Sequence, residues 1–217
     1  MCIRDSFLTA HRCLTVTEDG PLQLGPGKLQ DRVVLVAGGA GAVGNAAIQL
    51  ARWSDATVIA TVSSAAKAQA AVAAGADHVI DYREQDVVEE IRKLAPHGVN
   101  TIVEVSAANA PIDAAVIALH GSVAVYADDG GAEHTLPVRP LMTPNARWQF
   151  VLVYTAPADV KARAVDAVSA AVAAGAVRVG VGAGMPLHHF PLEKAAEAHA
   201  AVEGSIVGKV LIDVVPD

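Results

Sequence analysis

The 217-residue sequence contains few aromatic residues, two cysteines and no excess of positive charge. Cys2 and Cys13 are too few for a disulfide framework or a cysteine-rich zinc site. Lys and Arg number 16 against 23 Asp and Glu, with no basic cluster, so we expect no nucleic-acid partner. No apolar run approaches the roughly 20 residues of a membrane-spanning helix, and the N-terminus lacks a signal-peptide pattern. These absences predict a cytoplasmic protein without a membrane partner.

Short β-branched runs alternate with helical segments along residues 7–176. Hydrophobic residues make up 53% of the chain and aromatic residues only 4%, which favours an α/β protein with closely packed small side chains. This alternation predicts a parallel sheet with helices on both faces, a doubly wound, six-stranded Rossmann fold. The expected strands are 33–36, 57–62, 78–82, 101–105, 122–126 and 148–154, and the expected helices are 7–16, 43–53, 63–74, 86–94, 111–119 and 157–174.

The two ends of the chain do not fit this alternation. Residues 1–6 resemble a translated sequencing-adapter scar, so we leave them out of the fold and expect the natural protein to begin further upstream. Residues 177–217 follow a sheet that is already complete. They contain an apolar run at 177–181, an expected helix at 192–202 and an expected strand at 209–215. We expect this tail to pack against another part of the protein.

A glycine-rich turn follows the first expected strand and opens a helix. It contains the pattern G-x-G-x-x-G at Gly39, Gly41 and Gly44. Residues without Cβ let the backbone approach a diphosphate, and the new helix directs its free N–H groups and positive dipole end toward that anion. The alternative is a tight strand-to-helix turn that binds no ligand. The predicted diphosphate-binding residues are Gly38, Gly39, Ala40, Gly41, Ala42, Val43 and Gly44.

The end of the second expected strand indicates which nucleotide is preferred. An NAD site carries an Asp or Glu there for the ribose 2′-hydroxyl. This sequence has Ser63 and Ser64 instead, with Lys67 one helical turn beyond and Tyr82 at the end of the third strand. A charge-assisted bond from Lys67 to a 2′-phosphate would contribute ~1.5–3 kcal/mol, or roughly 10- to 150-fold in affinity. Together these residues favour NADPH, although a solvated lysine and a packing tyrosine are the plainer interpretation of each alone.

Several spaced segments together resemble the medium-chain dehydrogenase/reductase family, in its zinc-free, zeta-crystallin-like quinone oxidoreductase branch. The resemblance runs from Phe7 to Val215 and is far more specific than the glycine pattern. The segments that carry it are Leu8-Thr9-Ala10, the run from Val36 to Gly44, Ala74 to Tyr82, Glu193 to His199, and Gly208 to Ile212.

The resemblance implies hydride transfer from NADPH to a quinone or another conjugated carbonyl. It places the 2′-phosphate on Ser63, Lys67 and Tyr82, in agreement with the argument from the residues. It also implies that a homodimer forms through the strand around Phe150–Val153. The nicotinamide side would fall on Ser106, Asn109, Tyr126, Phe150 and Val151.

One part of the family pattern is missing from the sequence. Such proteins carry an N-terminal GroES-like barrel of roughly a hundred residues or more, a typical domain size. No such segment precedes Phe7, so we interpret residues 7–176 as the dinucleotide-binding domain and 177–217 as a remnant of the catalytic domain. An isolated tail of this kind is expected to expose apolar surface and to dock poorly.

Hydride transfer between stacked partners requires proximity rather than a dedicated acid, so we predict no catalytic side chain. His188 and His189 could suggest a metal pair, but adjacent residues of an extended chain point to opposite faces, and no metal site is predicted. Two other functions stay open: a non-enzymatic NADPH-binding module, and a methyltransferase, which the missing acid after the second strand disfavours. A short-chain reductase is excluded because no tyrosine has a lysine four residues later.

Overall fold

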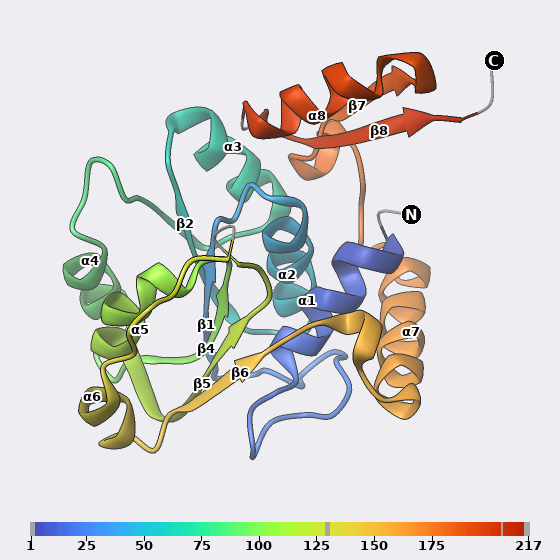
Figure 1. Cartoon of the computed structure of the whole chain (residues 1–217). Coiled ribbons are helices and arrows are strands. Elements are labelled where there is room, and N and C mark those ends of the chain that lie inside the picture. Colours follow the sequence, from blue (N-terminus) through green and yellow to red (C-terminus); the bar gives the residue numbers. More distant parts are fainter. Residues whose placement is uncertain (1–2, 129–130, 205, 215–217) are drawn as a thin grey trace.

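Six parallel strands form one sheet in the order β3-β2-β1-β4-β5-β6 (Figure 1). A computed structural model describes residues 3–128, 131–204 and 206–214 of the chain. The strand order reverses between β1 and β4, which makes the carboxyl ends of these two strands the expected place for a ligand. The strands are β1 (Val33–Ala37), β2 (Thr57–Val62), β3 (His78–Asp81), β4 (Val99–Glu104), β5 (Ile117–Val125) and β6 (Arg147–Phe150). The predicted Rossmann sheet is confirmed.

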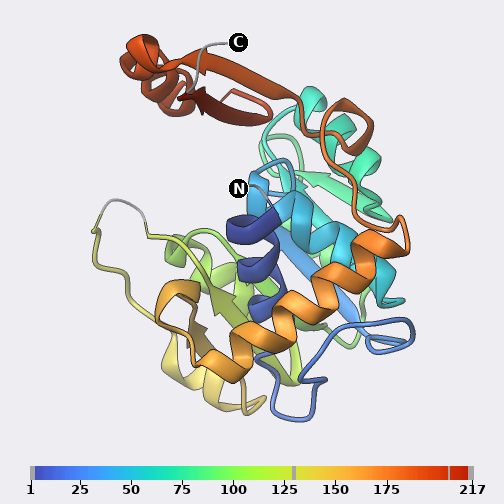
Figure 2. The ribbon, with the colours of Figure 1, turned by 90° about the vertical axis from the view of Figure 1, so that its right-hand side faces the viewer.

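Helices cover the two faces of the sheet because both faces of its central strands are apolar. In β1, Val34 and Val36 pack into one hydrophobic layer while Leu35 packs into the other. The first layer lies under α1 (Leu8–Leu14), α2 (Ala42–Trp53), α3 (Ala65–Ala74) and α7 (Ala158–Ala173). The second lies under α4 (Val87–Leu94) and α5 (Ala110–Val116), with the short α6 (Val138–Met142) beside α5. Figure 2 shows α7 running across the first layer.

Several boundaries differ from those predicted, and three of the differences have a clear structural setting. Residues 117–119 belong to β5 rather than to a helix, because Ile117 pairs with Val99 ahead of a register shift in the β4–β5 ladder. The edge strand β6 ends at Phe150, near the end of its partner β5, and a 3₁₀ turn follows (Val153–Thr155). The first helix is preceded by a π-helical turn (Ile3–Phe7) in which Ser6 is buried, within the segment that we left out of the fold.

The tail forms a small unit above the carboxyl ends of the sheet, beside α3 (Figures 1 and 2). Two parallel strands, β7 (Leu187–Pro191) and β8 (Lys209–Asp213), pair with each other and contact α8 (Ala195–Glu203). The sequence did not predict β7, and Val215 lies outside the described residues. A short 3₁₀ turn (Val181–Ala183) lies in the connection to α7, and another (Leu192–Lys194) precedes α8.

The connection to the tail is held by buried amide side chains of α2. Gln49 pairs with the backbone of Arg178 through two hydrogen bonds, one donated by Gln49 Nε2 at 3.1 Å and one accepted by Gln49 Oε1 at 2.8 Å. Asn45 donates to the carbonyl oxygen of Ala183 at 2.6 Å. Both amides are at least 97% buried, so these bonds fix the connection to the helix that the glycine turn opens.

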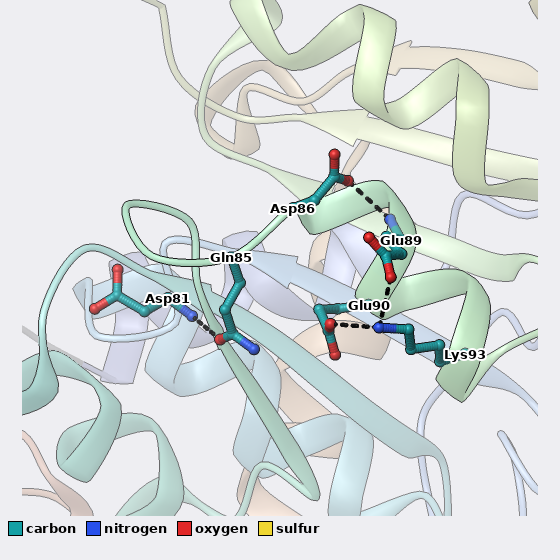
Figure 3. A network of polar contacts seen from close by, with 6 residues as sticks. All are labelled: Asp81, Gln85, Asp86, Glu89, Glu90 and Lys93. Atoms are coloured by element: carbon teal, nitrogen blue, oxygen red, sulfur yellow. Dashed lines mark hydrogen bonds and ion pairs between the residues drawn. The ribbon is translucent and has the colours of Figure 1, made fainter.

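The loop between β3 and α4 is ordered by polar contacts (Figure 3). Gln85 accepts a hydrogen bond from the backbone N–H of Asp81 at 3.0 Å, and Asp86 caps α4 by accepting from the N–H of Glu89 at 2.9 Å. Lys93 binds the carboxylates of Glu89 and Glu90 one turn later. This network holds the segment that carries Tyr82.

No helix among the described residues has the length and apolarity to cross a membrane.

Candidate functional site

The glycines of the turn between β1 and α2 have different physical roles. Gly38 has a φ of +69°, a conformation that side-chain-bearing residues rarely adopt. A Cβ on Gly39 would lie 2.8 Å from the Cβ of Ala60, and one on Gly44 would collide with the backbone of Gly38. These glycines therefore allow the turn to pack against β2 and against itself. Gly41 is exposed, with an ordinary φ of −75°.

Gly41 stands at the N-cap of α2, and no side chain among the described residues caps this helix. The first N–H groups of an α-helix have no partner within the helix, and the helix dipole adds partial positive charge there. Ala42 and Val43 follow in the first turn, both half-buried. A diphosphate could accept from these N–H groups, beside the exposed backbone of Gly41. The turn therefore fits the predicted diphosphate.

A cleft of about 250 Å³ opens beside this turn. Lys67 and Ser63 line it, with Lys67 Nζ donating to Ser63 Oγ at 3.0 Å. Tyr82, half-exposed, also lines it. Among the described residues that line the cleft, Lys67 is the one charged side chain, and none is an acid. The cleft is lined by Gly38, Ala40, Gly41, Val62, Ser63, Lys67, Tyr82, Val105, Tyr126, Ile206, Val207 and Gly208.

A second cleft of about 420 Å³ continues from the first on the α4 and α5 side, sharing Gly38, Val105 and Tyr82 with it. Ser106 and Asn109 line this second cleft. The structure therefore groups them with Tyr82, whereas the resemblance implies that they lie on the nicotinamide side.

Tyr126, Phe150 and Val151 lie together at the carboxyl ends of β5 and β6, around a separate hollow. Tyr126 also lines the cleft at the glycine turn, so it connects the two regions. Burial raises the pKa of the Tyr126 hydroxyl, which therefore stays protonated through the physiological range. Phe150 is 68% exposed and Val151 is buried. The structure thus brings these three predicted residues together, apart from Ser106 and Asn109.

Sequence reasoning missed two groups of residues at these clefts. Glu104 and Asp113, both buried, line the second cleft, and their only sequence signal is an acid within an apolar strand and another within an apolar helix. Residues 206–208 of the tail line the first cleft. The hydrophobic pattern of the sequence could not predict that these tail residues line the cleft, because their position depends on how the tail folds back over the sheet.

The described residues contain no cluster of three or more His, Cys, Asp or Glu side chains that could hold a metal ion. The rings of the two adjacent tail histidines bind different partners. His188 Nε2 lies 2.9 Å from the carbonyl oxygen of Val207, and His189 Nδ1 lies 3.0 Å from Asp213 Oδ1. They therefore do not converge on a common point.

Known proteins are similar to this chain over the segment that forms the glycine turn and the sheet. A family model described as zinc-binding dehydrogenase matches residues 42–170. A quinone oxidoreductase from Sus scrofa is 28% identical over 184 residues, which are 83% of this chain and 54% of that protein. A synaptic vesicle membrane protein VAT-1 homolog from Homo sapiens is 35% identical over 99 residues, 46% of this chain and 23% of that protein.

Among solved structures, a quinone oxidoreductase from Escherichia coli complexed with NADPH superposes with a TM-score of 0.79 at 25% identity. The alignment covers 96% of this chain and 63% of that structure. The matched part of the chain spans about half the length of the quinone oxidoreductase from Sus scrofa. The matched part includes the strand–turn–helix unit and the sheet that carries both clefts.

Proposed function

This chain belongs to the zinc-binding dehydrogenase family, in the quinone oxidoreductase branch of the medium-chain dehydrogenases/reductases, and from that premise we propose that it is the cofactor-binding part of an NADPH-dependent oxidoreductase. The substrate class is a quinone or another conjugated carbonyl. The observation that carries the cofactor choice is the pairing of Lys67 with Ser63 at the end of β2, in a cleft whose described lining residues include no acid. A carboxylate there would repel a 2′-phosphate, whereas an ammonium and a hydroxyl attract it.

The proposed roles follow the order of residues along the sheet edge. The N–H groups at the start of α2 would bind the diphosphate, and Ser63, Lys67 and Tyr82 would bind the 2′-phosphate end. Tyr126, Phe150 and Val151 would form the wall at the nicotinamide end. Bound NADPH would supply a hydride to the carbonyl acceptor, while these residues hold the two partners in place. The chain itself then needs no catalytic side chain.

The experiment that tests this proposal compares NADPH and NADH binding by nucleotide fluorescence. The unmodified chain should prefer NADPH, and Lys67→Ala should lose roughly 10- to 150-fold in NADPH affinity while NADH affinity stays nearly constant. Lys28→Ala is the matched control, because Lys28 is an exposed lysine in the loop before β1, at the opposite end of that strand. Equal affinity for both nucleotides, or an equal loss in the control, would refute the NADPH assignment.

Turnover distinguishes the enzyme from the alternative, a non-enzymatic NADPH-binding module. Consumption of NADPH in the presence of a simple quinone supports the oxidoreductase. Tight NADPH binding without turnover, in this chain and in any longer form of the protein that contains it, supports the module. Binding of S-adenosylmethionine in place of NADPH would instead favour a methyltransferase.

We also propose that the protein forms a homodimer through the edge of β6. Three side chains in and after this edge strand, Phe150, Leu152 and Tyr154, are 68%, 59% and 69% exposed, while Val151 and Val153 between them are buried. An exposed apolar row on an edge strand is a ready surface for pairing with another chain. A second copy of the same edge offers a complementary surface related by twofold symmetry.

A further inference from the structure

Glu104 and Asp113 are two acids buried against each other beneath the second cleft. Glu104 ends β4 and Asp113 lies in α5, and each exposes only 1% of its surface. Glu104 Oε1 accepts two hydrogen bonds from the turn that follows β4, one from the backbone N–H of Ser106 at 2.7 Å and one from Asn109 Nδ2 at 3.0 Å. A single carboxylate oxygen thus holds both ends of the turn 106–109.

Asp113 has no such partners. Neither of its carboxyl oxygens reaches a donor among the described residues, and the group in hydrogen-bonding contact with it is the carboxyl of Glu104. Two acceptors in contact, removed from water, repel each other unless a proton lies between them. Burial, together with the charge of Glu104, raises the pKa of Asp113 to about 9. Burial also raises the pKa of Glu104, while the hydrogen bonds from Ser106 and Asn109 oppose that shift.

We propose that Glu104 and Asp113 share one proton, with Asp113 as the donor and Glu104 as the carboxylate, and that this pair positions the turn 106–109 at the cofactor cleft. The proton adds Asp113 to the donors that surround Glu104, among them the Ser106 N–H and the Asn109 amide. The pair keeps one negative charge, which is acceptable in a buried site because several donors point at it. The inference rests on the proposed function for the identity of the ligand that the turn would contact.

Loss of the shared proton to solvent at alkaline pH would leave two carboxylates in contact. Their repulsion would move Glu104 away from Ser106 and Asn109, and the turn would lose its fixed position. Among the described residues, those that line this cleft on the β1, β2 and α4 sides are uncharged: Leu35, Thr61 and Val87. The titratable neighbours are Tyr82, after β3, and Tyr126, after β5.

The test is NADPH affinity between pH 7 and pH 10 in the unmodified chain, Asp113→Asn and Glu104→Gln. Asparagine donates a hydrogen bond but does not titrate, so Asp113→Asn should match the unmodified chain at pH 7 and keep its affinity at high pH. The unmodified chain should lose about tenfold or more above pH 9. Glu104→Gln should not show this alkaline loss, because its amide oxygen can still accept from Ser106 and Asn109 and its amide nitrogen can donate to Asp113. Tyr82 and Tyr126 are present in all three proteins, so their titration cancels. A parallel alkaline loss in Asp113→Asn would overturn the proposal.

Infrared difference spectroscopy without any nucleotide provides a separate readout. A protonated-carboxyl C=O band should be present at pH 7 in the unmodified chain and absent in Asp113→Asn. If the band is present but the chain does not bind NADPH, the proposed function is refuted and the shared proton is supported. Its absence at pH 7 would overturn the shared proton even if NADPH binds.

Discussion

The imidazole Nε2 of His11 accepts a hydrogen bond from the backbone N–H of Leu24 at 3.3 Å, inside the core between α1 and the loop before β1. An accepting Nε2 requires the neutral ring, and Nδ1 has no partner among the described residues. Burial, with a smaller contribution from the charge of Arg12, lowers the pKa of His11 from 6.5 to about 4. His11 therefore links the stability of this layer to pH.

We expect the chain to become less stable as the pH falls from about 6.5 toward 4, because in this range the unfolded state binds a proton that the folded state excludes. The contribution of His11 is fully present above pH 6.5, and its loss reaches about 3 kcal/mol near pH 4. Urea unfolding at pH 7.5, 6 and 5 should show a flatter pH dependence in His11→Gln. The exposed His97→Gln is the control and should keep the slope of the unmodified chain. Identical slopes in all three proteins would contradict the prediction.

Two glycines of the turn should respond differently to alanine. Gly44→Ala places a Cβ against the backbone of Gly38 and should lower the free energy of unfolding by about 1–3 kcal/mol. At Gly41 the backbone is compatible with alanine, and the nearest atom to a new Cβ is the Gly38 carbonyl oxygen at 3.3 Å. Gly41→Ala should therefore fold, and it should lose NADPH affinity because a methyl group at this cleft-lining position would reduce the space for the diphosphate. Denaturant unfolding measures the loss of stability, and nucleotide titration measures the loss of NADPH affinity. The diphosphate site would be contradicted if Gly41→Ala bound NADPH weakly only because it was unfolded.

The cap of α4 should contribute measurably to stability (Figure 3). Asp86→Ala removes the acceptor for the Glu89 N–H and should cost about 1 kcal/mol. Asp159→Ala is a suitable control, because Asp159 lies in the first turn of α7 and its exposed side chain pairs with Arg163 at 2.8 Å. Its expected cost is below about 0.5 kcal/mol. Thermal or urea unfolding measures both, and equal losses would argue against a specific cap.

The edge of β6 should control oligomeric state. Leu152→Asp introduces a charge into the exposed apolar row and should shift the chain from dimer to monomer in sedimentation velocity. Leu22→Asp is the matched control, because Leu22 is a comparably exposed leucine (69% against 59%) in the loop before β1. A monomeric unmodified chain, or dissociation caused equally by the control, would contradict the interface.

Much of the fold could be predicted because its signals are local. The apolar runs at β1 and β2, the glycines of the turn, and Gly75 with its φ of +109° after α3 each act within a few residues. The errors occurred where distant partners decided the outcome. Residues 117–119 have a helical pattern, but pairing with β4 makes them strand, and β7 forms only because β8 lies beside it.

Spacing along the chain sets the strand–turn–helix unit, the alternation that builds the sheet, and the placement of Ser63, Lys67 and Tyr82 at strand ends, so these features could be predicted from the sequence. Which strand ends share a cleft depends on long-range packing and is visible only in the folded chain. The tertiary structure placed Ser106 and Asn109 beside Tyr82, brought Ile206 to Gly208 over the glycine turn, and buried Glu104 against Asp113. These contacts join separate segments across the sheet edge, and burial there changes the chemistry of side chains that would be ordinary carboxylates in water.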